Sequence, residues 1–377
     1  MRRTVTLLAL CMMVVSACRP QLGPSPTPTP SSIAGSLVPS QAMTVGIHLP
    51  GAVGSLAGPV LDIGITGSLQ GANITVAIEP FSGGDQSFIG AGRTDAVDLF
   101  VASTAAALAA NAAGGDLVMI SSLQRSSSWR LMTLASGQLE SLAQLAEGTI
   151  YIDGLHGDEM PLLNAMKVAG VSTEKLTLVF PEDPVVSFDP AQLIDGTVLA
   201  AFVRSFDGSV RLAQYVDPVT GVSVGESFYR EIAIDDATEG LGIWVSAASI
   251  ESDDAKIAVA ATLVALTDSF GKCRDDVAAC ATVVADSSVS DLSVEALAYG
   301  VNAINASLWP NPQGLFEIDR AALQVEIDMA FSVGLVASKG DAGSLIFDEI
   351  LAMASQSWPA GVDRNGSAWV PLELVLP

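Results

Sequence analysis

Short apolar runs alternate with amphipathic segments along most of the chain, and loops rich in glycine or polar residues separate them. Runs of alternating or continuous Val, Ile and Leu predict strands at Met43 to Leu49, Ala72 to Glu79, Ala96 to Val101 and Leu117 to Leu123. The helical patterns between them include an Ala-rich segment that Ser103 can cap. The repeated order of strand, loop and helix predicts an α/β fold with parallel sheets, whose ligand-binding loops follow the carboxyl ends of the strands.

The same alternation begins again after Trp129 to Leu134. Further strands are predicted at Gly148 to Asp153, Leu176 to Phe180 and Thr197 to Val203, with a helix at Met160 to Gly170. The roughly 330 residues that follow Met43 exceed the size at which a single core usually stops growing. We therefore expect two lobes.

The first residues have the pattern of an export signal. Arg2 and Arg3 provide a positive start, and Leu7 to Val15 form an apolar segment that is too short to cross a bilayer stably. Val15-Ser-Ala-Cys18 resembles the bacterial lipobox, which implies cleavage before Cys18 and lipidation of that cysteine. Residues 1–17 are thus predicted to be a lipoprotein signal peptide, and the protein is predicted to be anchored on the extracytoplasmic face of the cell membrane. The alternative is an ordinary secretory signal with an incidental cysteine.

Residues 18–42 are rich in Pro, Ser and Thr and have no apolar periodicity. Such a composition favours an extended, semi-rigid tether over a packed element. The alternative is a disordered recognition segment for proline-binding modules, for which an exported bacterial protein has little obvious use.

The charge of the chain narrows its range of partners. Seventeen Lys and Arg residues stand against 41 Asp and Glu, a formal net charge of −24. A charge of this sign repels the phosphates of nucleic acid, so nucleic acid is nearly excluded as a partner.

The chain has four cysteines, and only two remain in the expected mature body. Cys11 leaves with the signal and Cys18 takes the lipid, so Cys273 and Cys280 are left for each other. In an oxidising compartment a local disulfide is expected, with two free thiols on a helix as the alternative. Seven residues of unbroken helix would hold the two cysteines too far apart, so the disulfide requires a turn between them.

Four segments together resemble a known group of proteins. They are Ser82-Gly-Gly-Asp85, Gly92 to Ser103, Ser141 to Gly154, and Leu162 to Gly170 leading to Thr173. Their order and spacing are similar to those of the type II periplasmic solute-binding proteins of ABC importers, specifically the group that binds nitrate, organosulfonates or thiamine-pyrimidine precursors. The resemblance extends from about Met43 to Gly334.

This resemblance implies two Rossmann-like lobes with mainly parallel sheets, joined by a two-strand hinge that lets them close on a ligand. The crossings are expected near Trp129 to Leu134 and near Glu231 to Trp244. The first lobe would comprise residues 43–131 and 241–309, and the second residues 132–240. Residues 310–377 would form closing helices and a tail. A monomer that presents its closed form to an ABC permease is the implied mode of action.

Ligand-binding residues are expected in the loops after the strands. From the first lobe these are His48, Gly84, Asp85, Ser103, Thr104 and Gln124, and from the second Gly154, His156, Asp158, Arg204 and Asp207. Each also has a structural explanation: Gly84 can ease a turn, Asp85 and Ser103 can cap helices, and Arg204 with Asp207 can form a solvated ion pair.

Neither a metal site nor a catalytic site is expected. His48 and His156 are the only histidines, and they lie in different predicted lobes without a clustered acid or cysteine at ligand spacing. Some fungal relatives of the group make the thiamine pyrimidine and carry a Cys-rich motif, which this sequence lacks. No nucleophile elbow, phosphate-binding loop or zinc-protease helix is present either, so we expect no enzyme activity and no cofactor.

The ligand prediction depends on Gly154-Leu-His-Gly-Asp-Glu159, which stands where relatives often have a hydroxyl-rich turn for an anion. An acid there favours a ligand with amino or amide donors, such as a pyrimidine or a flavin-like ring. Arg125 and Arg204 favour an organosulfonate or nitrate instead. A third hypothesis is a sensory or structural surface lipoprotein that kept the hinged fold and lost transport.

Overall fold

The computed structural model describes residues 37–50, 54–66, 69–81, 96–124, 126–137, 139–181, 188–219, 221, 225, 228–234, 240–287 and 290–374. These residues belong to one compact unit, Ser36–Pro377. The predicted signal peptide, Cys18, most of the predicted tether, Gly84 and Asp85 lie outside the described residues. The expectations for them stay predictions.

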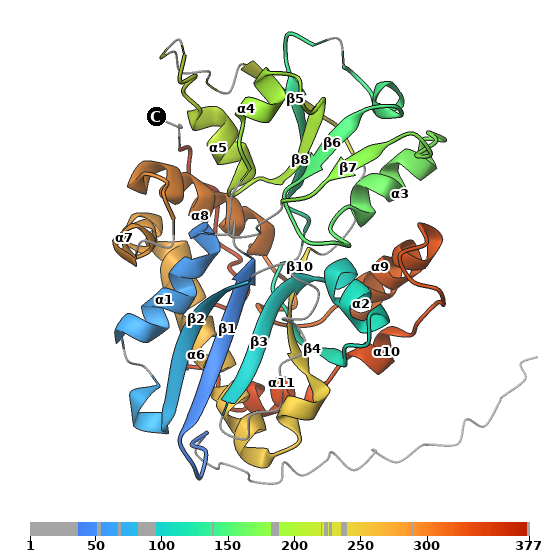
Figure 1. Cartoon of the computed structure of the whole chain (residues 1–377). Helices are drawn as coiled ribbons and strands as arrows, with labels where there is room; N and C mark the ends of the chain where they lie inside the picture. The colour runs from blue at the N-terminus through green and yellow to red at the C-terminus, as the bar shows by residue number, and fades with distance from the viewer. Residues whose placement is uncertain are drawn as a thin grey trace, which may run out of the picture. The chain divides into compact units, whose positions relative to one another are not determined.

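The first sheet has five strands in the order β2-β1-β3-β10-β4 (Figure 1). They are β1 (Met43–Pro50), β2 (Ile74–Phe81), β3 (Ala96–Ser103), β4 (Leu117–Ser122) and β10 (Leu241–Ser246). β1 is parallel to β2 and to β3, whereas β10 is antiparallel to both β3 and β4. Four strands therefore run in one direction and β10 opposes them.

The second sheet repeats this plan with the order β7-β6-β8-β5-β9. Its strands are β5 (Trp129–Leu134), β6 (Thr149–Ile152), β7 (Thr177–Val179), β8 (Ala200–Arg204) and β9 (Tyr229–Ile232). β6 is parallel to β7 and β8, and β5 is antiparallel to β8 and β9. The two opposing strands, β5 and β10, are those that directly follow the two passages of the chain between the sheets. Two lobes with mainly parallel sheets and a double connection confirm the expected fold class.

The chain passes from one sheet to the other between β4 and β5 and returns between β9 and β10. β5 begins at Trp129 and pairs only within the second sheet. The lobe boundary placed after Leu131 from sequence thus falls inside β5. The alternating burial of β5 suits an interior strand of either sheet, so its own pattern does not tell which sheet it joins.

Helices cover both faces of the first sheet. They are η1 (Gly54–Leu56), α1 (Ala57–Thr66), η2 (Gln70–Ala72), α2 (Thr104–Ala112), η5 (Ala247–Ile250), α6 (Asp253–Asp275), α7 (Val277–Ser287) and α8 (Val294–Leu308). Side chains of α1 and α6 share one hydrophobic core with β1 and β3, and α2 packs in a second core with Trp244 on the other face. α6 begins at an N-cap, where the hydroxyl of Ser252 accepts a 3.1 Å bond from the amide of Ala255.

The second lobe is smaller and has shorter helices. They are η3 (Leu142–Leu145), α3 (Met160–Val168), α4 (Ala191–Ile194) and α5 (Gly208–Gln214). α3 covers one face of the sheet through Leu162 and Met166, and Leu193 and Leu212 of α4 and α5 cover the other. Strands that are buried on both faces account for the continuous apolar runs of this part of the sequence.

The last helices are α9 (Arg320–Ser332), α10 (Ala342–Leu345) and α11 (Asp348–Ser355). α9 packs against α2 of the first lobe and against α3 of the second (Figure 1). At its end, the ammonium group of Lys167 on α3 donates to the carbonyl oxygen of Ser332. α11 packs on α6 of the first lobe. Within the described part of the chain, no helix combines the length and apolar character needed to cross a membrane.

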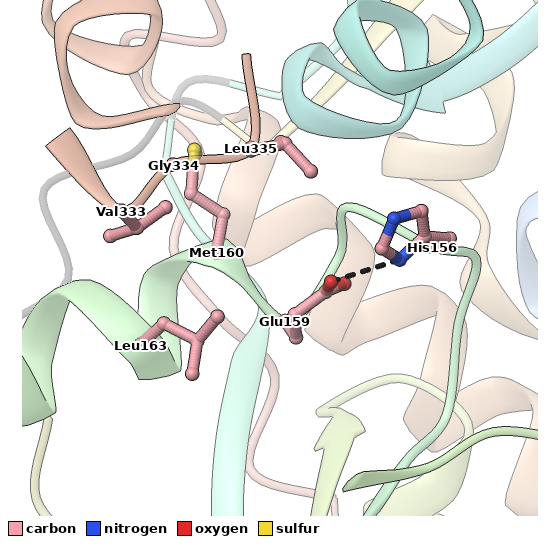
Figure 2. A pocket seen from close by; sticks show the side chains of 7 residues that line it. All are labelled: His156, Glu159, Met160, Leu163, Val333, Gly334 and Leu335. Carbon is pink, nitrogen blue, oxygen red and sulfur yellow. Dashed lines mark ion pairs between the residues drawn. The ribbon is translucent and has the colours of Figure 1, made fainter. Parts of the chain in front are cut away.

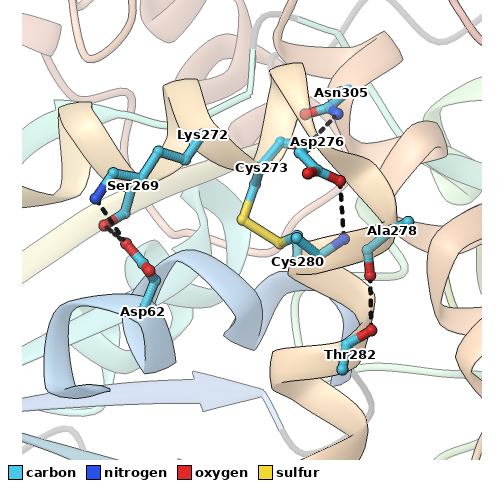
Figure 3. Close-up of a disulfide and its surroundings, with 10 residues drawn as sticks. Asp62, Ser269, Lys272, Cys273, Asp276, Ala278, Cys280, Thr282 and Asn305 are labelled. Carbon is cyan, nitrogen blue, oxygen red and sulfur yellow. Dashed lines mark hydrogen bonds and ion pairs between the residues drawn. A yellow bond between two sulfur atoms is a disulfide. The ribbon is translucent and has the colours of Figure 1, made fainter. Parts of the chain in front are cut away.

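Cys273 and Cys280 form a disulfide with their Cα atoms 5.0 Å apart (Figure 3). α6 ends at Asp275 and α7 begins at Val277, so the turn required between the two cysteines lies at Asp276. The amide of Cys280 donates to the carbonyl oxygen of Asp276 at 3.1 Å, and the side-chain amide of Asn305 on α8 donates to the carbonyl oxygen of Cys273 at 3.2 Å. The disulfide thereby ties α6 to α7, and the bond from Asn305 connects this corner to α8.

Candidate functional site

The two lobes meet where β3 ends and α2 begins. Ser103 is the N-cap of α2, and its hydroxyl oxygen accepts a 3.1 Å hydrogen bond from the amide of Ala106. The same hydroxyl donates to a carboxylate oxygen of Asp158 in the second lobe. Ser103 thus caps its own helix, as the sequence predicted, and also contacts the opposite lobe.

Asp158 lies in the loop between β6 and α3 and is 2% exposed. Its other carboxylate oxygen accepts a 2.8 Å bond from the amide of Leu155 and lies 3.5 Å from the guanidinium of Arg204. Burial raises the pKa of Asp158, while Arg204 and the hydroxyl of Ser103 act against that rise. The carboxylate therefore occupies the interface between the lobes, at the first turn of α2.

Arg204 is the last residue of β8 and is 3% exposed. Its guanidinium lies over the ring of Trp129, 4.1 Å from the centroid, and the rings of Trp129 and Phe202 stack with their centroids 4.8 Å apart. Burial lowers the pKa of Arg204, and the carboxylates of Asp158 and Asp153 oppose this shift. Its Nη1 atom is buried without a hydrogen-bond partner among the described residues.

A second set of charges lies behind Arg204 in the same lobe. Asp153, directly after β6, and Asp207, directly before α5, are both buried. Burial, with a further contribution from the charge of Asp207, raises the pKa of Asp153 to about 7. Burial likewise raises the pKa of Asp207 to about 6, although Arg211 lies 3.1 Å away and opposes the shift. Arg211 also lies 2.8 Å from Asp291, which belongs to the segment before α8 in the first lobe.

Apolar side chains hold the two lobes together on either side of these charges. Phe206, from the loop between β8 and α5, is fully buried in the main core of the first lobe. Leu155 and Met160 of the second lobe pack in the core that contains α2 and Trp244. Between them, Gly157 has a φ of +107°, and a Cβ atom there would lie 2.7 Å from the backbone of Ala105. The structure is therefore closed at this point of the interface.

Little space remains beside Ser103 and Asp158. The cavity lined by Ser103, Thr104, Trp129 and Asp158 has a volume of about 10 Å³. A cavity of this size holds one water molecule at most. A ligand that contacts both Ser103 and Arg204 would require these lobes to separate first.

The structure brings five of the predicted residues to this interface: Ser103, Thr104, Gly154, Asp158 and Arg204. Gly154 lies so close to Asp158 and Trp129 that a Cβ atom there would approach the carboxylate to 2.5 Å and the indole ring to 2.9 Å. Asp207 belongs to the adjoining set of charges. Gln124 lies at the hinge, where its amide donates to the hydroxyl of Ser307 at 3.0 Å and its oxygen accepts from the amide of Leu241 at 3.3 Å.

The two histidines lie on separate elements. His48 of β1 is 3.0 Å from Asp98 of β3 and stacks on Phe100. His156 is two-thirds exposed and is 3.0 Å from Glu159. Both line a cavity of about 200 Å³, and Val333, Gly334 and Leu335, which directly follow α9, line its other side (Figure 2). Among the described residues, no three His, Cys, Asp or Glu side chains form a group that could hold a metal ion.

Sequence reasoning missed Trp129, Asp153 and Arg211 as members of the interface. Asp153 ends a predicted strand, so the rule that places sites after strands could have found it. Arg211 stands four residues after Asp207 on a helical segment, a spacing that brings the two side chains together. No local signal marks Trp129, because the pairing of β5 with β8 brings it beside Arg204.

No protein family matches the sequence, and no curated protein matches it by sequence. Solved structures do match. The alkanesulfonate-binding protein SsuA from Xanthomonas axonopodis pv. citri, bound to MOPS, is 18% identical with a TM-score of 0.59, over 82% of this chain and 99% of that chain. The periplasmic nitrate-binding protein NrtA from Synechocystis PCC 6803 is 11% identical with a TM-score of 0.60, over 87% of this chain and 92% of that chain.

An enzyme has the same fold. A DSZB mutant in complex with biphenyl-2-sulfinic acid is 14% identical with a TM-score of 0.54, over 84% of this chain and 99% of that chain. At these identities the likeness is one of fold. The chain has the two-lobed fold of the type II periplasmic binding proteins, as the sequence predicted.

Proposed function

We propose that this chain is the extracytoplasmic solute-binding protein of an ABC importer and that it captures a small molecule between its lobes. The observation that carries the proposal is a set of buried polar and aromatic side chains from both lobes, at or after the ends of β3, β6 and β8 and at the start of β5: Ser103, Asp158, Arg204 and Trp129. Solved proteins of this fold include binders of alkanesulfonates and nitrate, which supports the same general role.

The ligand that suits this interface best is a vitamin-like heteroaromatic compound with amino or amide donors, such as a thiamine-pyrimidine precursor or a flavin. Three buried carboxyl groups, those of Asp153, Asp158 and Asp207, stand against the guanidinium groups of Arg204 and Arg211. The carboxylate of Asp158, which directly faces Ser103 and Arg204, favours a ligand that donates hydrogen bonds. Trp129 provides a ring on which a heteroaromatic ligand can stack once the guanidinium moves aside.

An organosulfonate or nitrate is the second candidate. Arg204 has a buried Nη1 without a hydrogen-bond partner among the described residues, and a guanidinium is suited to bidentate recognition of oxyanions. The structural neighbours bound to MOPS and biphenyl-2-sulfinic acid support this candidate. Against it, Asp158 would repel an anion placed between Ser103 and Arg204.

A thermal-shift screen of the protein without residues 1–18 tests the proposal. The panel comprises thiamine-pyrimidine precursors, riboflavin, taurine and other sulfonates, nitrate and amino acids. A ligand at about 1,000 times its dissociation constant adds about 4 kcal/mol to the free energy of unfolding, which a thermal shift detects. Asp158→Asn should abolish the shift, while the exposed Glu174→Gln should leave it unchanged.

Each outcome of the screen has a meaning. A heteroaromatic hit that Asp158→Asn abolishes supports the first candidate, and a sulfonate or nitrate hit that Arg204→Met abolishes supports the second. No hit on the whole panel would favour the hypothesis of a sensory or structural surface lipoprotein that lost transport. A hit that survives both substitutions would place the binding site elsewhere.

We further propose that the protein is anchored through a lipid on Cys18 and acts as a monomer. Labelled palmitate should enter the full-length protein expressed in a bacterium, and Cys18→Ala should abolish the label and release the protein from the membrane. If the variant stays entirely in the membrane fraction without label, the anchor is not Cys18.

A further inference from the structure

A further cavity lies away from Ser103 and Asp158, between α8 of the first lobe and the second sheet. It has a volume of about 370 Å³, and β5, β9, α5 and α8 form its walls. This volume is within the range of small-molecule pockets in proteins. None of the residues discussed above as the candidate ligand site lines it.

Two residues of the second lobe that line this cavity carry buried hydroxyl groups without a hydrogen-bond partner among the described residues. One belongs to Tyr229 of β9, which is 7% exposed, and the other to Ser209 in the first turn of α5. Burial raises the pKa of Tyr229 to about 12, so its phenol keeps its proton and can donate. A buried hydroxyl group without a partner costs free energy, and a bound ligand with an acceptor would remove that cost.

The remaining walls are mostly apolar and carry no net charge. Met132 and Leu212 contribute from the second lobe, and Ala303 and Ala306 from α8. Arg130 and Glu231 are partly exposed at the cavity and lie 3.5 Å apart, so their charges offset each other. A neutral ligand therefore suits this cavity better than an anion or a cation.

The first lobe contacts the second closely next to this cavity. A Cβ atom on Gly300 of α8 would lie 2.5 Å from the carbonyl oxygen of Phe206. Just before α8, the carboxylate of Asp291 lies 2.8 Å from the guanidinium of Arg211. α8 is therefore held against the loop that precedes α5. The shape of the cavity depends on this contact and hence on the closed arrangement of the lobes.

We propose that this cavity is a second small-molecule site, which takes a neutral, ring-bearing compound with a hydrogen-bond acceptor and favours the closed arrangement of the lobes. The acceptor meets the hydroxyl groups of Tyr229 and Ser209, and the ring packs against Met132, Leu212 and Ala303. Because the ligand contacts both lobes, its binding free energy is available only when they are together.

Binding of benzamide, nicotinamide, 4-hydroxybenzamide and indole to the protein without residues 1–18 tests the site by ligand-observed NMR. The amides should bind, and indole, which has no comparable acceptor, should bind more weakly. Tyr229→Phe keeps the ring and should weaken amide binding about tenfold, the loss expected for one hydrogen bond. Ala306 of α8 lines the cavity, so the larger side chain of Ala306→Phe should occupy it and prevent binding. Glu174→Gln, which removes an exposed carboxyl group of the second lobe, is the control and should change nothing.

A distance measurement tests the coupling to lobe closure. Spin labels on Ala112→Cys of α2 and Val168→Cys of α3 report the separation of the lobes at two exposed positions. Saturating benzamide should narrow the distance distribution toward the closed form in the wild-type background but not with Ala306→Phe. Failure of all three amides to bind, or binding that Ala306→Phe leaves intact, overturns the site. Binding without any change in the distances overturns the coupling.

Discussion

Replacement of Asp153 by asparagine removes a buried carboxyl group that should make the stability of the protein depend on pH. Burial raises the pKa of Asp153 from 3.8 to about 7 in the folded protein. The folded protein therefore keeps a proton at pH values where the unfolded chain has lost it. The stability that this proton contributes is fully present below the unfolded pKa and is lost as the pH rises through about 7.

The size of the effect follows from this shift. At about pH 5, Asp153 is about two pH units below its folded-state pKa, and each unit corresponds to about 1.4 kcal/mol. Asp153 should therefore make the free energy of unfolding about 3 kcal/mol larger at about pH 5 than at about pH 8. Asp153→Asn should lose this difference because an amide does not titrate. Asp207, whose pKa is raised to about 6, should leave a smaller dependence in the same direction.

Urea unfolding followed by tryptophan fluorescence at the two pH values measures the effect. Glu174→Gln removes an exposed carboxyl group of the same lobe and is the matched control, which should keep the wild-type pH dependence. The reasoning from burial is wrong if Asp153→Asn retains the full wild-type difference, because the carboxyl group would then be charged in the folded protein at both pH values.

Three further predictions concern the contact between the lobes and the disulfide. Gly157→Ala should lower the free energy of unfolding by about 3 kcal/mol, because Gly157 has a φ of +107° and an added Cβ atom would meet the backbone of α2. Gly170 has a φ of +70°, but an added Cβ atom would have no described atom within 4 Å, so Gly170→Ala should cost less in the same urea titration. Arg204→Met leaves the buried carboxylate of Asp158 without its cation and should lower the free energy of unfolding by about 3 kcal/mol. A second substitution that removes the carboxylate of Asp158 should recover much of this loss in a double-mutant cycle. Replacing Cys273 and Cys280 by serine should cost about 2 kcal/mol, measured against the wild-type protein without reductant, because the loop that the disulfide closes is short. An equal loss for both glycines, additivity in the cycle or an unchanged stability without the disulfide would contradict the respective argument.

The sequence predicted those features that depend on neighbouring residues. Strands such as Met43–Pro50 and helices such as Met160–Val168 follow from local periodicity, and the N-cap at Ser103 follows from residue type and position. The turn at Asp276 followed from the geometry that a disulfide needs.

What the sequence did not reveal depends on residues that are far apart in the chain. Trp129 lies beside Arg204 because β5 pairs with β8, and strand pairing across 70 or more residues leaves no local pattern. Asp153 and Asp207 meet for the same reason, and their raised pKa values arise from burial that only the packed structure defines. The place of α9 on both lobes likewise has no signal in its own sequence.

The insertion of β10 between β3 and β4 has a consequence for the order of folding. The second sheet is complete within one continuous segment, from Trp129 to Ile232, whereas the first sheet lacks its fourth strand in spatial order until Leu241–Ser246 has been made. Until then β3 and β4 have no shared neighbour, and each presents an unpaired edge. Long-range pairing of this kind is slow compared with local structure formation. The first lobe is therefore expected to finish folding last, because its sheet is complete only when the six-residue strand β10 pairs with β3 and β4.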